Sequence, residues 1–461
     1  MLFSWAPHAL YTKLPLLVLC LISLLLVSRT SSSSLFSLRI SSLGSFSFGK
    51  TGKWTYSPRT NKTALVNSED ALIFAGFEGC ASSREFYWHL ASDKQGQWDR
   101  FPVVDSWKWD LENTGCDLRD LETHKEEMVR DLVEKGGWLI LGDSITEGHF
   151  FSISCSLYPH VIATPDYLEN PFFDRAWPQN IYLNPNSFLV QSLKFPPGFN
   201  ITQTPLITFR RIDLLLSTEE LAQFHKTRHS EEDGFVLFSE EAVWSLSPSY
   251  YLPEIFFSPL PQGNYAHLIA STAGHWTTTL FSGFANDTKD GIERYGEGID
   301  GLIGFFGEAT EMWANTVQEA IENDSEGVVL AGGRRARRQA IVRPYLTGHE
   351  DCHDYRQPWT NIEPFKWDWY NWGSIWKFNQ VFETLLSGSR YADIHYVAIE
   401  RPARLRPDAH ATSDCLHIMA GAGVLEGWTN YIWHFVTREI SGSKPFWLAI
   451  GGKGANEDSN K

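Results

Sequence analysis

The sequence has no excess of basic residues, and this absence narrows the classes of protein to which the chain can belong. It holds 39 lysines and arginines against 55 aspartates and glutamates, for a formal net charge of −16 at pH 7. Nucleic-acid-binding proteins, and proteins that bind membranes through a basic surface, depend on the opposite balance. The charge therefore argues against nucleic acid as a partner and against a generally basic membrane-binding surface.

Internal repeats are not visible, and cysteine is scarce, with six residues in the chain. Cys20 lies within an apolar N-terminal segment. The other five are Cys80, Cys116, Cys155, Cys352 and Cys415. Since five is an odd number, at least one of these thiols must stay unpaired.

What the chain does have is the composition of a globular protein, with 43% hydrophobic and 14% aromatic residues. Short apolar runs predict strands at residues 138–141, 206–212, 267–270, 340–345 and 394–399. Helical periodicity predicts helices at residues 145–157, 302–322, 374–386 and 424–437. Strands that alternate with helices indicate a three-layer α/β/α sandwich with a mainly parallel sheet, whose ligands belong at the carboxyl ends of the strands.

Two short motifs lie at those strand ends. Gly142-Asp143-Ser144 follows the first predicted strand, and Asp414-Cys415-Leu416-His417 follows the last one. A serine hydroxyl becomes a good nucleophile when a histidine takes its proton and a carboxylate orients that histidine. The two motifs supply all three groups, with Asp414 and His417 spaced so that they can share one face of a helical turn or tight loop.

Each motif alone also has an ordinary interpretation. Gly-Asp is a common turn pair, and serine is a common helix N-cap. The placement of both motifs at the same end of one predicted sheet is what favours a catalytic serine, histidine and aspartate.

Further segments stand in a fixed order around these motifs. Gly142-Asp143-Ser144 is followed by Ser152 and Cys155. The other segments are Phe48-Gly49-Lys50-Thr51-Gly52-Lys53-Trp54, Trp107-Lys108-Trp109, Cys116-Asp117-Leu118, Gly274-His275-Trp276 and Arg406-Pro407-Asp408-Ala409-His410. From residue 48 to residue 440 the chain thereby resembles the trichome birefringence-like and PC-esterase proteins of plants and fungi, a branch of the SGNH (GDSL-type) hydrolase fold.

This resemblance implies a polysaccharide O-acetyltransferase of the secretory pathway that uses Ser144, His417 and Asp414. It implies no bound cofactor, an acetyl donor as co-substrate, a glycan as acceptor and room for a membrane partner that supplies the donor. The Gly274-His275 segment is expected to position the oxyanion and substrate beside the Ser144 N–H. The resemblance also implies a Cys352–Cys415 disulfide, and a bridge from Cys155 to either Cys80 or Cys116.

Two positions depart from the family pattern. Thr272 stands where plant members have an asparagine that is expected to donate to the oxyanion, which leaves the second donor uncertain. Ile418-Met419 replaces a Trp-Cys pair, so one family disulfide is expected to be absent.

The N-terminus predicts the compartment. Residues 14–27 are almost wholly apolar, and residues 9–28 reach the length of a membrane span if Lys13 extends its charge to the interface. A cleaved signal peptide is the alternative. No small-x-small cleavage site stands out after Val27, which favours an uncleaved signal anchor with its short N-terminus in the cytosol.

The predicted organisation is a cytosolic segment at residues 1–8, an anchor at 9–28 and a serine-rich stem at 29–47. An N-terminal lobe at 48–130, a catalytic domain at 131–440 and a tail at 441–461 then face the lumen, as in a single-pass Golgi membrane protein. Four glycosylation acceptors agree with a lumenal location, namely Asn61, Asn200, Asn286 and Asn323.

Two competing interpretations concern function. Residues 349–353, His-Glu-Asp-Cys-His, match the zincin pattern, but no helical apolar stripe surrounds them, so no metal site is expected. The same catalytic residues would also serve a polysaccharide O-acetyl esterase, in which water takes the place of the sugar. A catalytically silent glycan-binding protein is the third possibility, supported by Thr272.

Overall fold

The computed structural model describes residues 52–60, 68–82, 101–111, 118–164, 178–229, 235–287, 294–366, 371–411 and 414–440. The predicted anchor, stem and tail, together with Cys116 and Asn61, lie outside these residues. Among the helices that are described, none is both long enough and apolar enough to cross a membrane.

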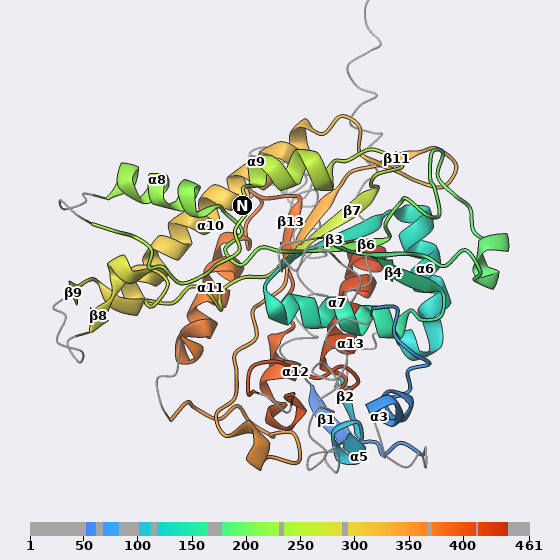
Figure 1. Ribbon diagram of the computed structural model, residues 1–461, viewed down its shortest axis with the longest axis horizontal. Helices are drawn as coiled ribbons and strands as arrows, with labels where there is room; N and C mark the ends of the chain where they lie inside the picture. Colours follow the sequence, from blue (N-terminus) through green and yellow to red (C-terminus); the bar gives the residue numbers. More distant parts are fainter. Residues whose placement is uncertain are drawn as a thin grey trace, which may run out of the picture. The chain divides into compact units, whose positions relative to one another are not determined.

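The centre of the described structure is a seven-stranded sheet (Figure 1). Its strands lie in the order β13-β12-β7-β3-β6-β5-β4. The first five of these strands are parallel to one another, whereas β5 and β4 are each antiparallel to the strand before them in this order. Their bounds are β3 Gly137–Gly142, β4 Val161–Thr164, β5 Gln179–Leu183, β6 Ile207–Arg211, β7 Tyr265–Ala270, β12 Gln339–Val342 and β13 Ile394–Tyr396.

Strand β3 is buried along its whole length, as its continuous apolar sequence predicts. The chain runs from β3 to β6 on one side and then returns to β7 on the other side of β3. The parallel strands thus have the doubly wound order 2-1-3-4-5, and the direction of winding reverses between β3 and β7. Ligands of such sheets bind outside the carboxyl ends of the strands at this point of reversal.

Helices cover both faces of the sheet (Figure 1). Helix α7 packs on β3, β6 and β4 and also contacts α6 and α13. On the other side of the sheet, α10 packs on β13, α8, α9 and α11, and buries an apolar face that includes Phe305, Phe306 and Trp313. The bounds are α6 Leu121–Lys135, α7 Ser144–Ser156, α8 Thr218–Arg228, α9 Pro248–Tyr251, α10 Gly298–Asn323, α11 Ile375–Leu385 and α13 Val424–His434.

An N-terminal lobe is formed by α3 (Ser68–Phe74), α5 (Phe101–Val104) and the antiparallel pair of β1 (Lys53–Tyr56) and β2 (Trp107–Asp110). Trp54 connects it to the rest of the chain, because its indole N–H donates to the Pro402 carbonyl at 2.9 Å and its ring lies under the Arg406 guanidinium. Helix α6 begins after its N-cap Asp120 and packs on β3. The predicted domain boundary at residue 130 therefore falls inside a helix of the sandwich.

The predicted mixed α/β class with a mainly parallel sheet is confirmed, and all nine predicted elements are present. Their ends differ. Strand β12 ends at Val342, before Pro344, which has no N–H to continue a sheet. Helix α13 ends at His434 and continues as a π-helix from Phe435 to Glu439. Helices α6 and α8 and strands β4 and β5 are among the elements that the sequence pattern did not predict.

Candidate active site

Ser144 is the first residue of α7, directly after the turn that follows β3. The Asp143 carboxylate caps this helix by accepting from the Ile145 N–H at 3.0 Å. Gly142 is needed in the turn, since a Cβ there would lie 2.8 Å from the Ser271 carbonyl oxygen and closer still to Thr146. The serine therefore lies at the positive end of a 13-residue helix, where a developing negative charge is stabilised.

Ser144, His417 and Asp414 form a continuous chain of hydrogen bonds. His417 Nδ1 lies 2.6 Å from Asp414 Oδ2, and His417 Nε2 lies 2.8 Å from Ser144 Oγ. A carboxylate only accepts, so the ring proton of a neutral His417 is on Nδ1. Nε2 is then free to accept the proton of the Ser144 hydroxyl, which is the geometry that nucleophilic catalysis requires.

Asp414 is held ionised by its surroundings. Its Oδ1 accepts from the backbone N–H groups of Leu416 and His417, each at 2.8 Å. Burial raises the pKa of Asp414. The hydrogen bond from the His417 ring, the electrostatic interaction with that ring and the two backbone N–H groups have the larger combined effect and lower the pKa to about 2. A carboxylate at this position therefore stabilises the imidazolium that forms when His417 takes a proton.

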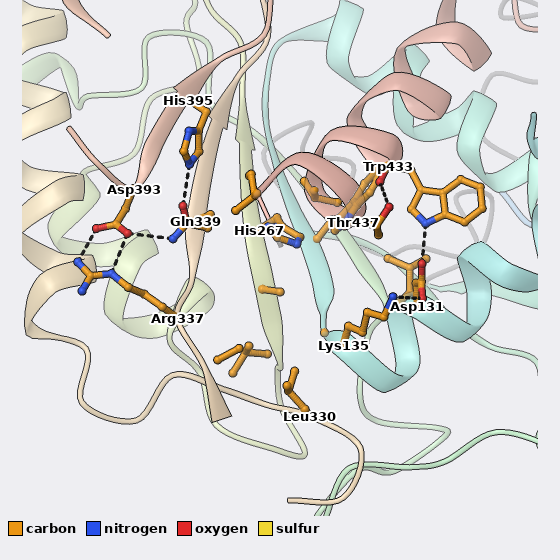
Figure 2. Close-up of a pocket in the computed structure, with 18 of the residues that line it drawn as sticks. Asp131, Lys135, His267, Leu330, Arg337, Gln339, Asp393, His395, Trp433 and Thr437 are labelled. Atoms are coloured by element: carbon orange, nitrogen blue, oxygen red, sulfur yellow. Dashed lines mark hydrogen bonds and ion pairs between the residues drawn. The ribbon is translucent and has the colours of Figure 1, made fainter. Parts of the chain in front are cut away.

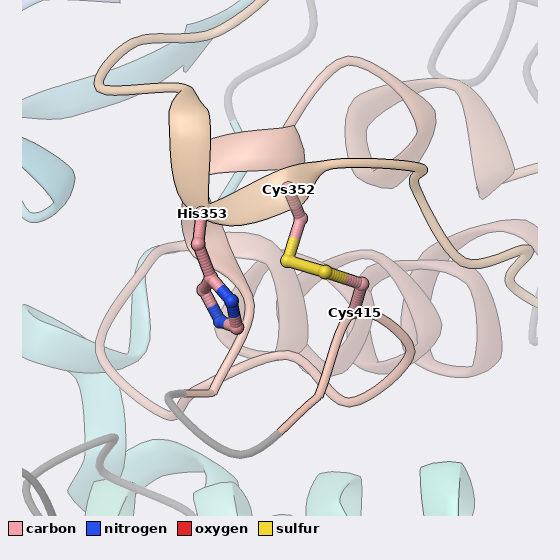
Figure 3. A group of neighbouring side chains, drawn as sticks. All are labelled: Cys352, His353 and Cys415. Carbon is pink, nitrogen blue, oxygen red and sulfur yellow. A yellow bond between two sulfur atoms is a disulfide. The ribbon is translucent and has the colours of Figure 1, made fainter.

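The loop that carries Asp414 and His417 is tied down by a disulfide. Cys352 and Cys415 are bonded, with their Cα atoms 5.5 Å apart, so the predicted bridge is present (Figure 3). The other described disulfide joins Cys155 to Cys80, which resolves the choice that the sequence left open. It lies near the far end of α7 from Ser144.

The zincin-like segment does not form a zincin site. It forms a loop that leads into a short 3₁₀-helix at Cys352–Asp354, so its histidines do not share one face of an α-helix. Among the described residues, one group of three side chains is close enough to hold a metal ion, Cys352, His353 and Cys415 (Figure 3). Its two sulfur atoms are bonded to each other and so are not thiolate ligands.

Strand β7 brings the Thr272–His275 segment to the same end of the sheet, beside β3. Thr272 is buried, and its hydroxyl donates to the Asp213 carbonyl at 2.6 Å. This bond occupies the single hydroxyl hydrogen, so Thr272 can donate to an oxyanion only if the bond breaks. A Cβ on Gly274 would overlap the Tyr345 hydroxyl, so glycine is required at this close approach.

His275 is the residue of this segment that faces charged groups next to Ser144. Its Nε2 lies 3.8 Å from Asp213 Oδ2 and 4.0 Å from Asp143 Oδ2, and its side chain is 28% exposed. Asp143 Oδ2 is buried without a hydrogen-bond partner among the described residues. His275 therefore presents a ring nitrogen close to both carboxylates, on the side of the sheet where Ser144 lies.

The sequence analysis missed several buried polar residues that follow β6 and β12. Asp213 accepts from the Arg211 Nε–H at 3.0 Å, and burial raises its pKa although His275 and Arg211 partly offset the effect. Arg343 donates to the Thr146 hydroxyl at 3.0 Å. Burial and the nearby Asp143 carboxylate raise the pKa of Tyr345. Each of these residues lies at, or a few positions after, the end of a parallel strand, and that position was the available signal.

A cavity of about 400 Å³ lies at the opposite, amino ends of β3, β7 and β12 (Figure 2). His267 and His395 line it. His395 Nε2 donates to Gln339 Oε1 at 2.7 Å, whereas Nδ1 of His267 is buried without a hydrogen-bond partner in the described structure. Burial, and secondarily His395, lowers the pKa of His267 to about 3. Among the described residues that line this cavity, no serine, carboxylate and histidine are linked as they are at Ser144.

Comparisons with known proteins add no family to these findings. The sequence matches no protein-family model, and a search of curated proteins finds no significant relative.

Proposed function

We propose that this protein is a serine-dependent O-acyltransferase that moves acetyl groups onto hydroxyls of a glycan. The observation that carries the proposal is the hydrogen-bonded chain from Asp414 through His417 to Ser144, at the carboxyl ends of a parallel sheet. Acetyl as the acyl group, and a cell-wall or capsular polysaccharide as acceptor, rest on the sequence resemblance.

The proposed reaction is a double displacement. Ser144 Oγ attacks the donor acetyl carbonyl while its proton passes to His417 Nε2; the donor leaving group then departs with that proton and leaves an acetyl-serine. A glycan hydroxyl gives its proton to His417 and attacks the acetyl carbon. The bond to Ser144 breaks, and the proton returns to the serine.

Oxyanion stabilisation in this scheme comes from the Ser144 N–H at the start of α7, with His275 as the second contact. The Thr272 hydroxyl is engaged with Asp213, whereas His275 is partly exposed and carries a ring N–H that can donate. A histidine donor would take the place of the asparagine that the family pattern leads one to expect.

A lumenal, membrane-anchored location belongs to the same proposal, with residues 9–28 as the anchor of a Golgi or other secretory-pathway protein. Two disulfides are typical of an oxidising compartment. Asn200, Asn286 and Asn323 are exposed, as glycosylation acceptors must be.

The second candidate is an O-acetyl esterase. Ser144 is partly exposed and the Asp414 side chain is 34% exposed, so water has access to the region where the acyl-enzyme would form. Water would then complete the second step in place of the sugar.

The deciding experiment incubates the purified full-length protein in detergent with 4-nitrophenyl acetate, with and without candidate polysaccharides, and follows nitrophenol release and acetyl incorporation. Acetyl transfer to a glycan supports the transferase, and release without transfer supports the esterase. Ser144→Ala is the matched control. If the wild-type protein turns over no ester but still binds glycan, the catalytically silent binding protein is the better interpretation.

A further inference from the structure

Two histidines that the proposed mechanism does not use meet directly behind the candidate catalytic loop. His349 belongs to the zincin-like segment, and His410 ends the Arg406–His410 segment. His349 Nδ1 lies 2.6 Å from His410 Nε2, and both side chains are buried. Each ring also contacts a backbone carbonyl, since His349 Nε2 lies 3.0 Å from the Arg404 oxygen and His410 Nδ1 lies 3.2 Å from the His417 oxygen.

These three contacts require three protons. A carbonyl oxygen only accepts, so His349 Nε2 and His410 Nδ1 must each carry a hydrogen. The contact between the two rings needs a third hydrogen, because two unprotonated nitrogens at that distance would repel. Two neutral imidazoles hold only two ring protons between them. A neutral pair must therefore lose one of the three hydrogen bonds, and a fully bonded pair carries one positive charge.

In the fully bonded pair, burial disfavours a charge on the His349 ring. Burial lowers the pKa of His349 to about 4, so this ring is neutral, donates through Nε2 and accepts through Nδ1. His410 then donates through both nitrogens. Of the charged groups that the structure describes, Asp408 raises the pKa of His349 and Arg404 lowers it. Asp408 is itself ion-paired with Arg406 in a fully buried contact at 3.0 Å.

The pair is connected to His417 through the backbone. The His417 carbonyl accepts from His410 and also from the Ala411 N–H at 2.8 Å. The His349 N–H donates to the Cys415 carbonyl at 2.9 Å, two residues before His417 and beside the disulfide. The backbone that carries the candidate general base is therefore held at Cys415 and at His417 by the same two histidines.

We infer that His349 and His410 are positioning residues that share three ring protons and hold the His417 backbone in register with Ser144. This inference rests on the proposed function for its catalytic consequence. The role of His349 in the zincin-like segment, and of His410 at the end of the Arg406–His410 segment, is then to hold the catalytic loop in position and not to bind zinc. When the third proton is lost as the pH rises, one hydrogen bond of the pair is lost. The position of the His417 backbone relative to Ser144 is then less well fixed.

The first test is structural and needs no activity. In full-length protein labelled with ¹⁵N-histidine, NMR near pH 6 should show three slowly exchanging ring N–H signals that all vanish or shift in both His349→Phe and His410→Phe. Only two such signals would overturn the inference. In the wild-type protein the three signals are also assigned by their nuclear Overhauser contacts to one another, so the count stands even if a variant fails to fold.

The second test is kinetic. His410→Phe should lower kcat for ester turnover by about 10- to 100-fold with KM changed less than about 2-fold, because a small displacement of a catalytic group is costly. The alkaline limb of the wild-type pH profile should disappear in this variant. The matched control is His160→Phe, a buried histidine bonded to Ser187 at the edge of the sheet, which should keep wild-type kcat.

The outcomes separate the two proposals. If three ring protons are found but the protein turns over no ester, the inference about the histidine pair is supported and the proposed function is rejected. Turnover with an unchanged alkaline limb in His410→Phe, or equal losses in His160→Phe, would reject the positioning role while the proposed function stands.

Discussion

The two ends of the central sheet both carry histidine, and they differ in what surrounds it. At the carboxyl ends, His417 is 17% exposed and has a partner at each ring nitrogen, a carboxylate and a serine hydroxyl. At the amino ends, His267 lines a cavity, its buried Nδ1 has no hydrogen-bond partner in the described structure, and burial holds its pKa near 3. The same side chain is thus arranged for proton transfer at one end and is kept neutral at the other.

The hydrogen-bond partners of a histidine are therefore a better guide to proton transfer than its position in a cavity. The amino-end cavity has a volume of about 400 Å³, yet its charged residues are paired with each other, Asp131 with Lys135 and Asp393 with Arg337. At the carboxyl end, Asp414 is instead hydrogen-bonded to His417, and His417 is hydrogen-bonded in turn to the hydroxyl of Ser144. Four changes test this contrast, in order of decreasing expected effect.

Replacing Ser144 by alanine should have the largest effect. Ser144→Ala removes the nucleophile while the Asp143 cap and α7 stay in place, so kcat for ester turnover should fall by about 10⁵- to 10⁶-fold without loss of thermal stability. Hydrolysis of 4-nitrophenyl acetate checks this. Ser156→Ala, at the other end of the same helix, should keep full activity, and equal activity in both variants would reject the assignment of Ser144.

Asp414→Asn tests the partner that distinguishes His417 from His267. The amide can present a hydrogen-bond donor to Nδ1 and favour the wrong tautomer, so kcat should fall by about 10⁴-fold. Stopped-time assays with the same ester are sensitive enough to detect this residual rate. An Asp393→Asn variant, altered at the amino end, should not lose ester turnover, and a comparable loss there would contradict the contrast.

Removal of the Cys352–Cys415 bridge should affect both stability and activity. The bridge closes a loop across 63 positions, and in the chain-entropy model its loss costs about 4 kcal/mol. Cys352→Ser should therefore lower the unfolding temperature and, at temperatures where the variant stays folded, also kcat.

Cys80→Ser is the matched control because it breaks a bridge across 75 positions at the far end of α7. It should cost similar stability and leave kcat unchanged. If both variants lose the same fraction of activity, the Cys352–Cys415 bridge has no special role in holding the loop.

The amino-end histidines predict the smallest effect, an acid sensitivity of folding. Burial lowers the pKa of His267 to about 3 and of His395 to about 4, against about 6.5 in the unfolded chain. Below pH 6.5 the unfolded chain binds protons that the folded protein does not, so stability is complete above this pH and falls as the pH falls. Between pH 7 and pH 5 each histidine should cost about 2 kcal/mol.

His267→Leu should remove the share of this pH dependence that belongs to His267, about 2 kcal/mol, measured from denaturant unfolding at pH 7 and at pH 5. His124→Leu, a substitution on the partly exposed start of α6, is the control for replacing a histidine outside this cavity. An unaltered pH dependence in His267→Leu would show that His267 is protonated in the folded protein.

Local sequence patterns were enough to predict the secondary structure around Ser144 and the class of the fold. An apolar run before Gly142 and a helix-forming stretch after Asp143 predicted the turn that presents Ser144, because strand burial, glycine and N-capping act over a few neighbouring residues. The alternation of strands and helices predicted the mainly parallel sheet, and the spacing of Asp414 and His417 predicted that they could bond to each other.

Only the tertiary structure decided which distant groups meet. The His417 ring and the Ser144 hydroxyl are 273 positions apart in the chain, and the His349 and His410 rings are 61 positions apart. The Cys80–Cys155 disulfide and the hydrogen bond from the Thr272 hydroxyl to Asp213 likewise join residues that are distant in the sequence. Such contacts depend on how the sheet orders its strands and how loops pack at its ends, and no local pattern of residue types encodes that order.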